Sequence, residues 1–401
     1  MQVLGSLRGS SSNQYPDING GNISEGSSTH SALLGNRRQS FPRGVVEEAS
    51  TLQEETTSNI TSNVLLVLEK YRLHAPRGKN QPLCAVNKFV SQIKHLIAQG
   101  EPISMVLPAF PFKSANKTTK VLGALPDKGE EMALKHLNNM CQEIGKYYKN
   151  GAQLYIVSDG LVYNGVSDEE VWRYGQALRQ LAREQSCDNI GFSRLSDLLN
   201  DDTLPEPLSE AEYVKYAPRF REQTLQRYLP RDFDVVKAIT NDPDINSTYC
   251  GYVKFLNLEL ADTLLKDQKM TTTHKIRCCK QVARHMITRG KAFADAILHR
   301  FPEHIRLSIH ASTDTKKISV SLIPQTGSLS MTPWHSALVY ASDGSISMQH
   351  AGTVSTATHI LVREEGQPYY FREDLPTYAA SSSTSLTSKR PIKLQTPGNH
   401  L

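Results

Sequence analysis

The stretch ISMVLP at residues 103–108 is a short apolar run that begins with a β-branched residue and is bounded by Pro102 and Pro108. Such a run predicts a buried strand. Two further runs, QLYIVSDG at residues 153–160 and NIGFSRL at residues 189–195, predict two more strands. The fold class then depends on what joins these three strands.

Helical periodicity fills both intervals between the strands. One helix is expected over residues 137–148, before Asn150-Gly151, and a second over residues 171–181, with Ser167 or Asp168 as its cap. The order strand, helix, strand, helix, strand is typical of an α/β fold. We therefore predict a Rossmann-like, mainly parallel sheet flanked by helices.

Further elements are expected on both sides of this core. Gly100 supplies the end signal for a helix before the first strand, and Pro302 stops a long helix after the third. The last strands predict a C-terminal strand-rich extension, either as a mixed or antiparallel addition to the sheet or as a smaller second layer. These expected elements are helices at 60–71, 86–96, 208–228 and 276–300, and strands at 305–311, 317–324 and 335–341.

The two ends of the chain have a different composition. Of the first 44 residues, 20 are Ser, Gly or Asn, and such a segment buries too little apolar surface to offset its ordering entropy. We predict a disordered leader over residues 1–56 and a disordered tail over 379–401. Residues 57–378 are then expected to form one folded domain.

Charge and cysteine content restrict the partners. The 45 Lys and Arg against 40 Asp and Glu give a formal charge of +5, which suits anionic small molecules better than nucleic acid. The six cysteines form no CxxC pair, so neither a zinc site nor a disulfide framework is indicated. No apolar run is long enough to span a membrane. We expect a cytoplasmic protein without a nucleic-acid or membrane partner.

Two loops that follow predicted strands hold candidate site residues, because ligands of α/β sheets bind beyond the carboxyl ends of the strands. In the first loop, Lys113 and Ser114 could grip a phosphate or carboxylate. The alternative is a loop whose Phe side chains fill the core and whose Lys is solvated. In the second loop, Ser158 and Asp159 lie at a strand end, and the alternative is an ordinary Asp-Gly turn.

The alternation of residues 305–310 places Arg306, Ser308 and His310 on one face of a strand. Arg306 would bind an oxyanion and His310 would exchange protons, unless this face simply contacts water. His335 adds a second imidazole beside Trp334, and Arg219 offers another cation on a helix.

Several cofactor motifs are missing. No GxGxxG follows a strand, and neither a Walker loop nor a GxSxG elbow is present. His310 is followed by Ala-Ser-Thr-Asp314 and not by the tight His-x-Asp spacing of non-haem iron enzymes, so no metal is expected.

Several segments together resemble the isocyanide (isonitrile) synthases, a family that includes the dityrosine and pyoverdine biosynthesis proteins. The resemblance covers roughly residues 60–345, in order. The segments include FPFKSANKTTK (110–120), LYIVSDGLVYNGV (154–166), GYVKFLNLEL (251–260), RLSIHAS (306–312) and TPWHSALV (332–339).

The resemblance implies a Rossmann-like enzyme that converts the amino group of an L-amino acid, often Tyr or Trp, to an isonitrile. The carbon donor would be ribulose 5-phosphate as co-substrate, without a metal or redox cofactor, and a downstream enzyme such as an oxygenase would take the product. The residues expected to bind substrate and phosphate are Lys113, Arg306, Arg219, Ser158 and Ser308, and those expected to act catalytically are His310, Asp159, His335 and Ser114.

Three other functions stay open at the level of sequence. The product could be an N-formyl amino acid such as N-formyltyrosine. The chain could be an inactive scaffold or binding protein that kept the fold. An enzyme that uses a nucleotide or S-adenosylmethionine on a Rossmann core would rest on fold analogy alone.

Overall fold

The computed structural model describes residues 43–73, 82–158, 166–199, 208–262, 270–310, 312, 315–324 and 331–374. The chain divides into two units, Met1–Ser50 and Thr51–Leu401. Of the first unit, the structure describes only the start of helix α2 (Arg43–Lys70). This helix begins inside the segment for which the sequence predicts disorder, since the residues after Pro42 include Val, Glu and Ala and no further proline interrupts them. Most of the leader, and the whole predicted tail, lie outside the described residues.

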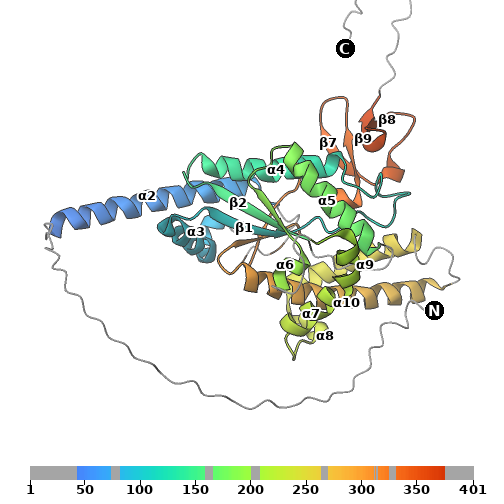
Figure 1. Cartoon of the computed structure of the whole chain (residues 1–401), viewed down its shortest axis with the longest axis horizontal. Helices are drawn as coiled ribbons and strands as arrows, with labels where there is room; N and C mark the ends of the chain where they lie inside the picture. The colour runs from blue at the N-terminus through green and yellow to red at the C-terminus, as the bar shows by residue number, and fades with distance from the viewer. Residues whose placement is uncertain are drawn as a thin grey trace, which may run out of the picture. The chain divides into compact units, whose positions relative to one another are not determined.

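A five-stranded, all-parallel sheet forms the centre of the second unit, in the order β3-β2-β1-β4-β5. Figure 1 labels two of its strands, β1 and β2. The Rossmann-like prediction is thereby confirmed. From β1 the chain adds strands on one side and then crosses to the other side, so the direction of winding reverses between β1 and β4. The strands are β1 (Ile103–Pro108), β2 (Ala152–Val157), β3 (Ile190–Ser193), β4 (Ile305–Ser308) and β5 (Ile318–Ser319).

Helices cover both faces of this sheet, as Figure 1 shows for α4 on one side and α10 on the other. Their ends carry the expected signals: Gly100 has φ +70° after α3, and Ser167 caps α5 in a capping box with Glu170. The helices are α3 (Asn87–Gln99), α4 (Lys128–Gly145), α5 (Asp168–Glu184), α6 (Leu195–Leu199), α7 (Glu210–Tyr228), α8 (Val235–Asn241), α9 (Pro243–Asp262) and α10 (Thr272–Arg300), with a short 3-10 turn η1 (Leu83–Ala85).

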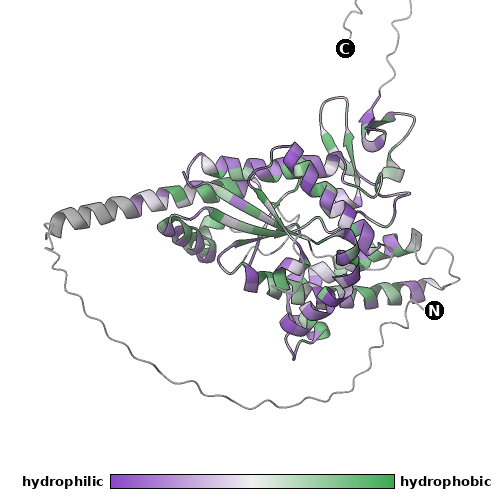
Figure 2. Ribbon diagram, in the orientation of Figure 1, coloured by the Kyte–Doolittle hydropathy of each residue, from purple (hydrophilic) through white to green (hydrophobic). Residues whose placement is uncertain are grey.

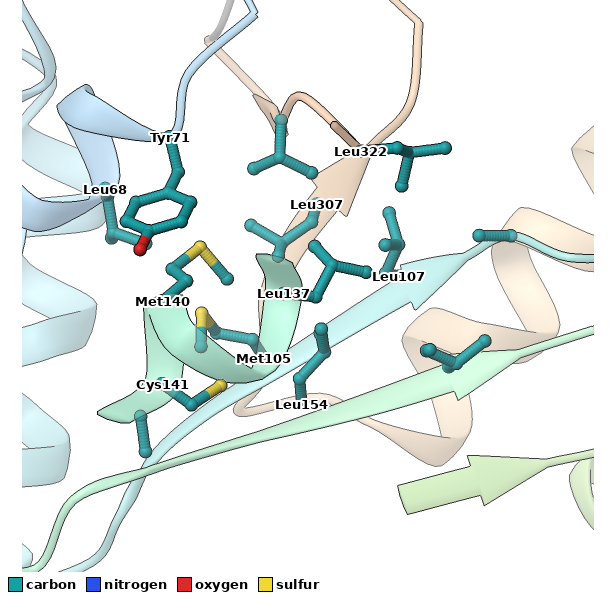
Figure 3. Close-up of a cluster of buried hydrophobic side chains, with 14 of the residues drawn as sticks. Leu68, Tyr71, Met105, Leu107, Leu137, Met140, Cys141, Leu154, Leu307 and Leu322 are labelled. Atoms are coloured by element: carbon teal, nitrogen blue, oxygen red, sulfur yellow. The ribbon is translucent and has the colours of Figure 1, made fainter. Parts of the chain in front are cut away.

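The two faces of the sheet have separate cores. Met105 and Leu107 of β1 pack with α2, α3 and α4, whereas Val106, between them, packs with α6, α7 and α10. The central strands therefore appear mostly green, that is hydrophobic, in Figure 2, as expected for a parallel sheet with both faces buried. Figure 3 shows the first core, where Leu137 and Met140 of α4 reach Met105 and Leu154, and all four side chains are fully buried.

A second, four-stranded sheet in the order β7-β6-β9-β8 forms the C-terminal part. The predicted strand-rich extension is confirmed, but its three expected strands separate: two become β4 and β5, parallel members of the main sheet, and the third becomes β6 of the second sheet. The elements here are β6 (Ala337–Tyr340), β7 (Ile346–Gln349), β8 (His359–Glu364) and β9 (Gln367–Glu373), with the turns η2 (Pro333–His335) and η3 (Ala351–Thr353).

Across the described part of the chain, no helix is both long and apolar enough to cross a membrane.

Candidate active site

The candidate site lies where β1 and β4 end, which is the point of reversal where ligands of open α/β sheets bind. The loop after β1 is held against the core by Phe110, which has a positive φ of 53° and is fully buried. A non-glycine residue adopts this conformation only when its surroundings impose it. The Phe110 ring packs 4.9 Å from the Trp334 ring, and the Ser114 N–H donates to the Trp334 carbonyl at 2.8 Å. The loop and η2 therefore form one rigid unit.

Lys113, predicted to bind a substrate anion, is buried inside this unit. Its Nζ lies 2.8 Å from both Asp127 and Glu130 and 3.0 Å from the Pro333 carbonyl. A lysine ammonium has three N–H groups, so these three partners leave none for a ligand. Burial alone would lower the pKa of Lys113, but the charges of Asp127 and Glu130 outweigh it and raise that pKa. Burial also raises the pKa of Asp127 to about 7, although Lys113 opposes this. Lys113 thus joins the loop to the start of α4.

Lys120, later in the same loop, is a buried cation with fewer partners. Its Nζ donates to Glu259 of α9 and lies 4.5 Å from the centre of the Phe255 ring. Glu259 also accepts from the Ser114 hydroxyl and, at 3.3 Å, from the Asn116 N–H. Among the described residues Glu259 is the one hydrogen-bond acceptor of Lys120, so the ammonium retains N–H groups for a ligand.

His335, in η2, lies beside Lys120 and Phe255. Its Nδ1 lies 3.0 Å from the Thr332 hydroxyl, while its Nε2 is buried and, within the described ranges, has no hydrogen-bond partner. Burial lowers the pKa of His335 well below its ordinary value, and the nearby charge of Lys120 lowers it further. The ring is therefore neutral at pH 7. A neutral imidazole with one nitrogen bonded and the other unpaired is suited to accept a proton.

Two more histidines lie around this centre. His310 follows β4 and retains an exposed surface, with its ring centre 6.4 Å from that of Tyr252 of α9. The surrounding protein lowers its pKa to about 4, and Lys317 contributes. His350 follows β7 of the second sheet, and burial together with Lys120 lowers its pKa. The backbone beside it holds the Lys120 loop, since Ala351 N–H donates to the Lys120 carbonyl at 3.1 Å.

Arg306 lies in β4, opposite Val106 of β1, on the face covered by α10. Its Nη1 is buried without a hydrogen-bond partner among the described residues. Burial lowers the pKa of Arg306 to about 10, which the charge of Asp295 opposes. A buried guanidinium with an unpaired N–H is suited to bind an anion.

The other predicted site residues are more dispersed. Ser308 is buried and its hydroxyl donates to the His310 carbonyl at 3.2 Å, so it shapes the turn after β4. Ser158 donates its N–H to Ser193 at the end of β3. Arg219 is exposed on α7. Asp159 lies outside the described residues.

Sequence reasoning missed Lys120, Glu259 and Phe255. Lys120 was hidden among the other polar residues of its loop. The signal for the other two was present in GYVKFLNLEL, where Phe255 and Glu259 are four residues apart and so share one helical face, and where Glu259 is an acid between two leucines. A buried acid requires a partner, and this one has Lys120.

Comparison with known proteins identifies the family of this chain. The family model described as "Pyoverdine/dityrosine biosynthesis protein" matches residues 93–362. The isocyanide synthase xanB of Aspergillus fumigatus is 43% identical over 339 residues, which are 82% of this chain and 43% of the relative. The L-tryptophan isonitrile synthase AmbI2 of Fischerella ambigua is 32% identical, over 70% of this chain and 81% of its own.

A solved structure is also similar. The crystal structure of the PvcA protein from Pseudomonas aeruginosa aligns with a TM-score of 0.67 and 28% identity, covering 78% of this chain and 99% of the other. The chain spans less than half of xanB and 20% of a second A. fumigatus relative, the isocyanide synthase-NRPS hybrid crmA. The residues that the family model matches include the main sheet and the loops that carry the site, and the chain therefore belongs to the pyoverdine/dityrosine biosynthesis protein family.

Proposed function

We propose that this chain is an isocyanide synthase that converts the amino group of an aromatic L-amino acid to an isonitrile, with ribulose 5-phosphate as the carbon donor. The observation that carries the proposal is the buried Nε2 of His335, which has no hydrogen-bond partner among the described residues and lies beside Lys120 at the reversal point of the sheet. The relatives named as L-tyrosine and L-tryptophan isonitrile synthases support it.

The first step of the proposed reaction requires the amino group of the substrate in its unprotonated form. An amino acid carries an ammonium group at neutral pH, and it must lose a proton before its nitrogen can attack the C2 ketone of the sugar phosphate and release water. His335 is neutral and its Nε2 is free to take that proton. The Thr332 hydroxyl at Nδ1 orients the ring.

Two cations serve the two anionic groups of the substrates. Lys120 has N–H groups left for the amino-acid carboxylate, next to His335. Arg306, on the α10 side of β4, would take the sugar phosphate through its unpaired Nη1. Lys113 acts differently from the sequence-based expectation, because its three partners make it a residue that positions the loop. His310, whose ring meets Tyr252 of α9 and is neutral at pH 7, would exchange protons near β4.

The test is incubation of the purified chain with each aromatic amino acid and ribulose 5-phosphate labelled with ¹³C at C2. Mass spectrometry is expected to find one labelled carbon in the product, and infrared spectroscopy an isonitrile band. His335→Gln is the matched control and should lose the product while retaining the unfolding temperature. A labelled formamide without the isonitrile band would replace this proposal with N-formylation. No labelled product with any amino acid would refute it.

A further inference from the structure

One face of α9 carries three residues that contact the site. Tyr252, Phe255 and Glu259 follow one another at spacings of three and four, so their side chains lie on the same side of the helix. Glu259 fixes the register of this face through its buried contacts with Lys120 and Ser114. A neighbouring face, with Leu256 and Leu260, is fully buried against α10.

The two aromatic side chains of this face lie against the catalytic histidines. The Phe255 ring centre is 4.6 Å from that of His335, and the Tyr252 ring meets the His310 ring edge-on at 6.4 Å. Both aromatic residues are only partly buried, so each retains some accessible surface.

Other aromatic side chains near the loop offer no such surface. Phe110 and Trp334 are buried to within 2% of complete burial and pack against one another. Phe112 is buried in a separate cluster with Trp172 and Tyr213. Among the described residues that touch His335 or His310, accessible aromatic surface therefore comes from α9.

We infer that Tyr252 and Phe255 form the wall that contacts the side chain of the amino-acid substrate and sets its preference for aromatic side chains. The inference rests on the proposed function. If the amine lies at His335 and the carboxylate at Lys120, the Cα between them is held beside Phe255, which lies within 5 Å of both groups. The substrate side chain starts from that Cα. An aromatic substrate ring can stack offset or edge-to-face on the ring of Phe255 or Tyr252 and is stabilised by this pairing, whereas an aliphatic side chain is not.

The inference is tested with Phe255→Leu and Tyr252→Leu, which keep apolar volume and remove the ring. We expect the ratio of kcat/KM for L-tyrosine to kcat/KM for L-leucine to fall about 3- to 10-fold in each variant. If one of the two amino acids is not turned over, its inhibition constant takes the place of kcat/KM in this ratio. The KM for ribulose 5-phosphate should stay unchanged. Tyr249→Leu is the matched control, because Tyr249 packs against the same α10 cluster as Tyr252 and Phe255 but, among the described residues, has no ring contact with His335 or His310.

The outcomes separate the two proposals. Isonitrile formation by wild type with an unchanged Tyr/Leu ratio in both variants would overturn the specificity inference and leave the proposed function standing. Loss of discrimination in Tyr249→Leu to the same extent would also overturn it, since the effect would then come from helix packing. Absence of isonitrile from wild type would overturn both. Unfolding temperatures within a few degrees of wild type confirm that each variant is folded.

Discussion

At the scale of single residues, the first prediction is that Lys113 stabilises the fold and does not bind substrate. Lys113→Met leaves Asp127 and Glu130 buried without their cation, and we expect it to lower the free energy of unfolding by about 3–5 kcal/mol. Lys117→Met is the control, because Lys117 forms a partly exposed pair with Glu170 worth at most about 1 kcal/mol. Urea unfolding measures both variants, and equal losses would contradict the structural role assigned to Lys113.

A second prediction at this scale concerns His335. A base works in its neutral form, and burial with Lys120 lowers the pKa of His335 well below 6.5. Activity should therefore persist as the pH falls through 6.5 and decline only below the lowered pKa. His335→Gln should reduce kcat by roughly 10²- to 10⁴-fold with little change in KM. The profile of kcat against pH is the measurement, and an acid limb at or above pH 6.5 would exclude His335 as the base.

At the scale of elements, the second sheet supports the site through η3. The Gly352 N–H donates to the Thr119 carbonyl at 2.9 Å, and a Cβ on Gly352 would lie 3.2 Å from Thr119 Cα. Gly352→Ala must push the Thr119 backbone and, with it, Lys120. We expect the KM for the amino acid to rise roughly 10-fold, since small displacements of binding groups are costly.

Gly290→Ala provides the comparison for this change, because Gly290 lies in α10 and has nothing within 4 Å of an added Cβ. It should leave kinetics unchanged and stabilise the helix by up to about 1 kcal/mol. Steady-state kinetics of Gly352→Ala and Gly290→Ala measure this difference in KM. Identical kinetics in the two alanine variants would mean that the second sheet does not position Lys120.

At the scale of the whole molecule, the formal charge of +5 is small, but the positive charge is concentrated on one helix. Helix α10 holds seven Lys and Arg and one acid, Asp295, so the rest of the chain is close to neutral. Arg277, Lys280 and Arg284 are exposed and follow at spacings of three and four along one side. In the described part of the chain no carboxylate pairs with these three.

This charge should attract the anionic sugar phosphate proposed as co-substrate. We expect kcat/KM for ribulose 5-phosphate to fall as salt rises, because screening shortens the reach of the field. The double variant Arg277→Glu, Arg284→Glu should lower kcat/KM at low salt and flatten its salt dependence, with kcat unchanged. Charge reversal at Lys94 and Lys149, away from α10, is the control. A salt dependence equal in all three proteins would show that α10 does not steer the substrate.

Most elements of the sheet were predictable because their signals are local. The apolar runs of β1, β2 and β3 stand between recognisable turns, and Gly100 and Ser167 mark helix ends. Helix α9 gave no comparable signal, since its apolar residues serve two purposes: Leu256 is buried in the cluster with α10, while Phe255 packs at the edge of that cluster and also contacts His335. The pairing of β4 and β5 also escaped prediction, because short strands carry no local mark of parallel or antiparallel partners.

The sequence by itself determined the α/β class, the loop that follows β1, and the types of side chain available there, because periodicity and composition act over a few residues. Only the tertiary structure decided which of those side chains are free to act. Lys113 and Lys120 are both loop cations in the sequence, yet within the described part of the chain three acceptors surround the Lys113 ammonium and a single acceptor meets that of Lys120. Those acceptors come from α4, η2 and α9, up to 220 residues away along the chain. No local pattern encodes such long-range contacts, since they arise only when the sheet and its helices pack together.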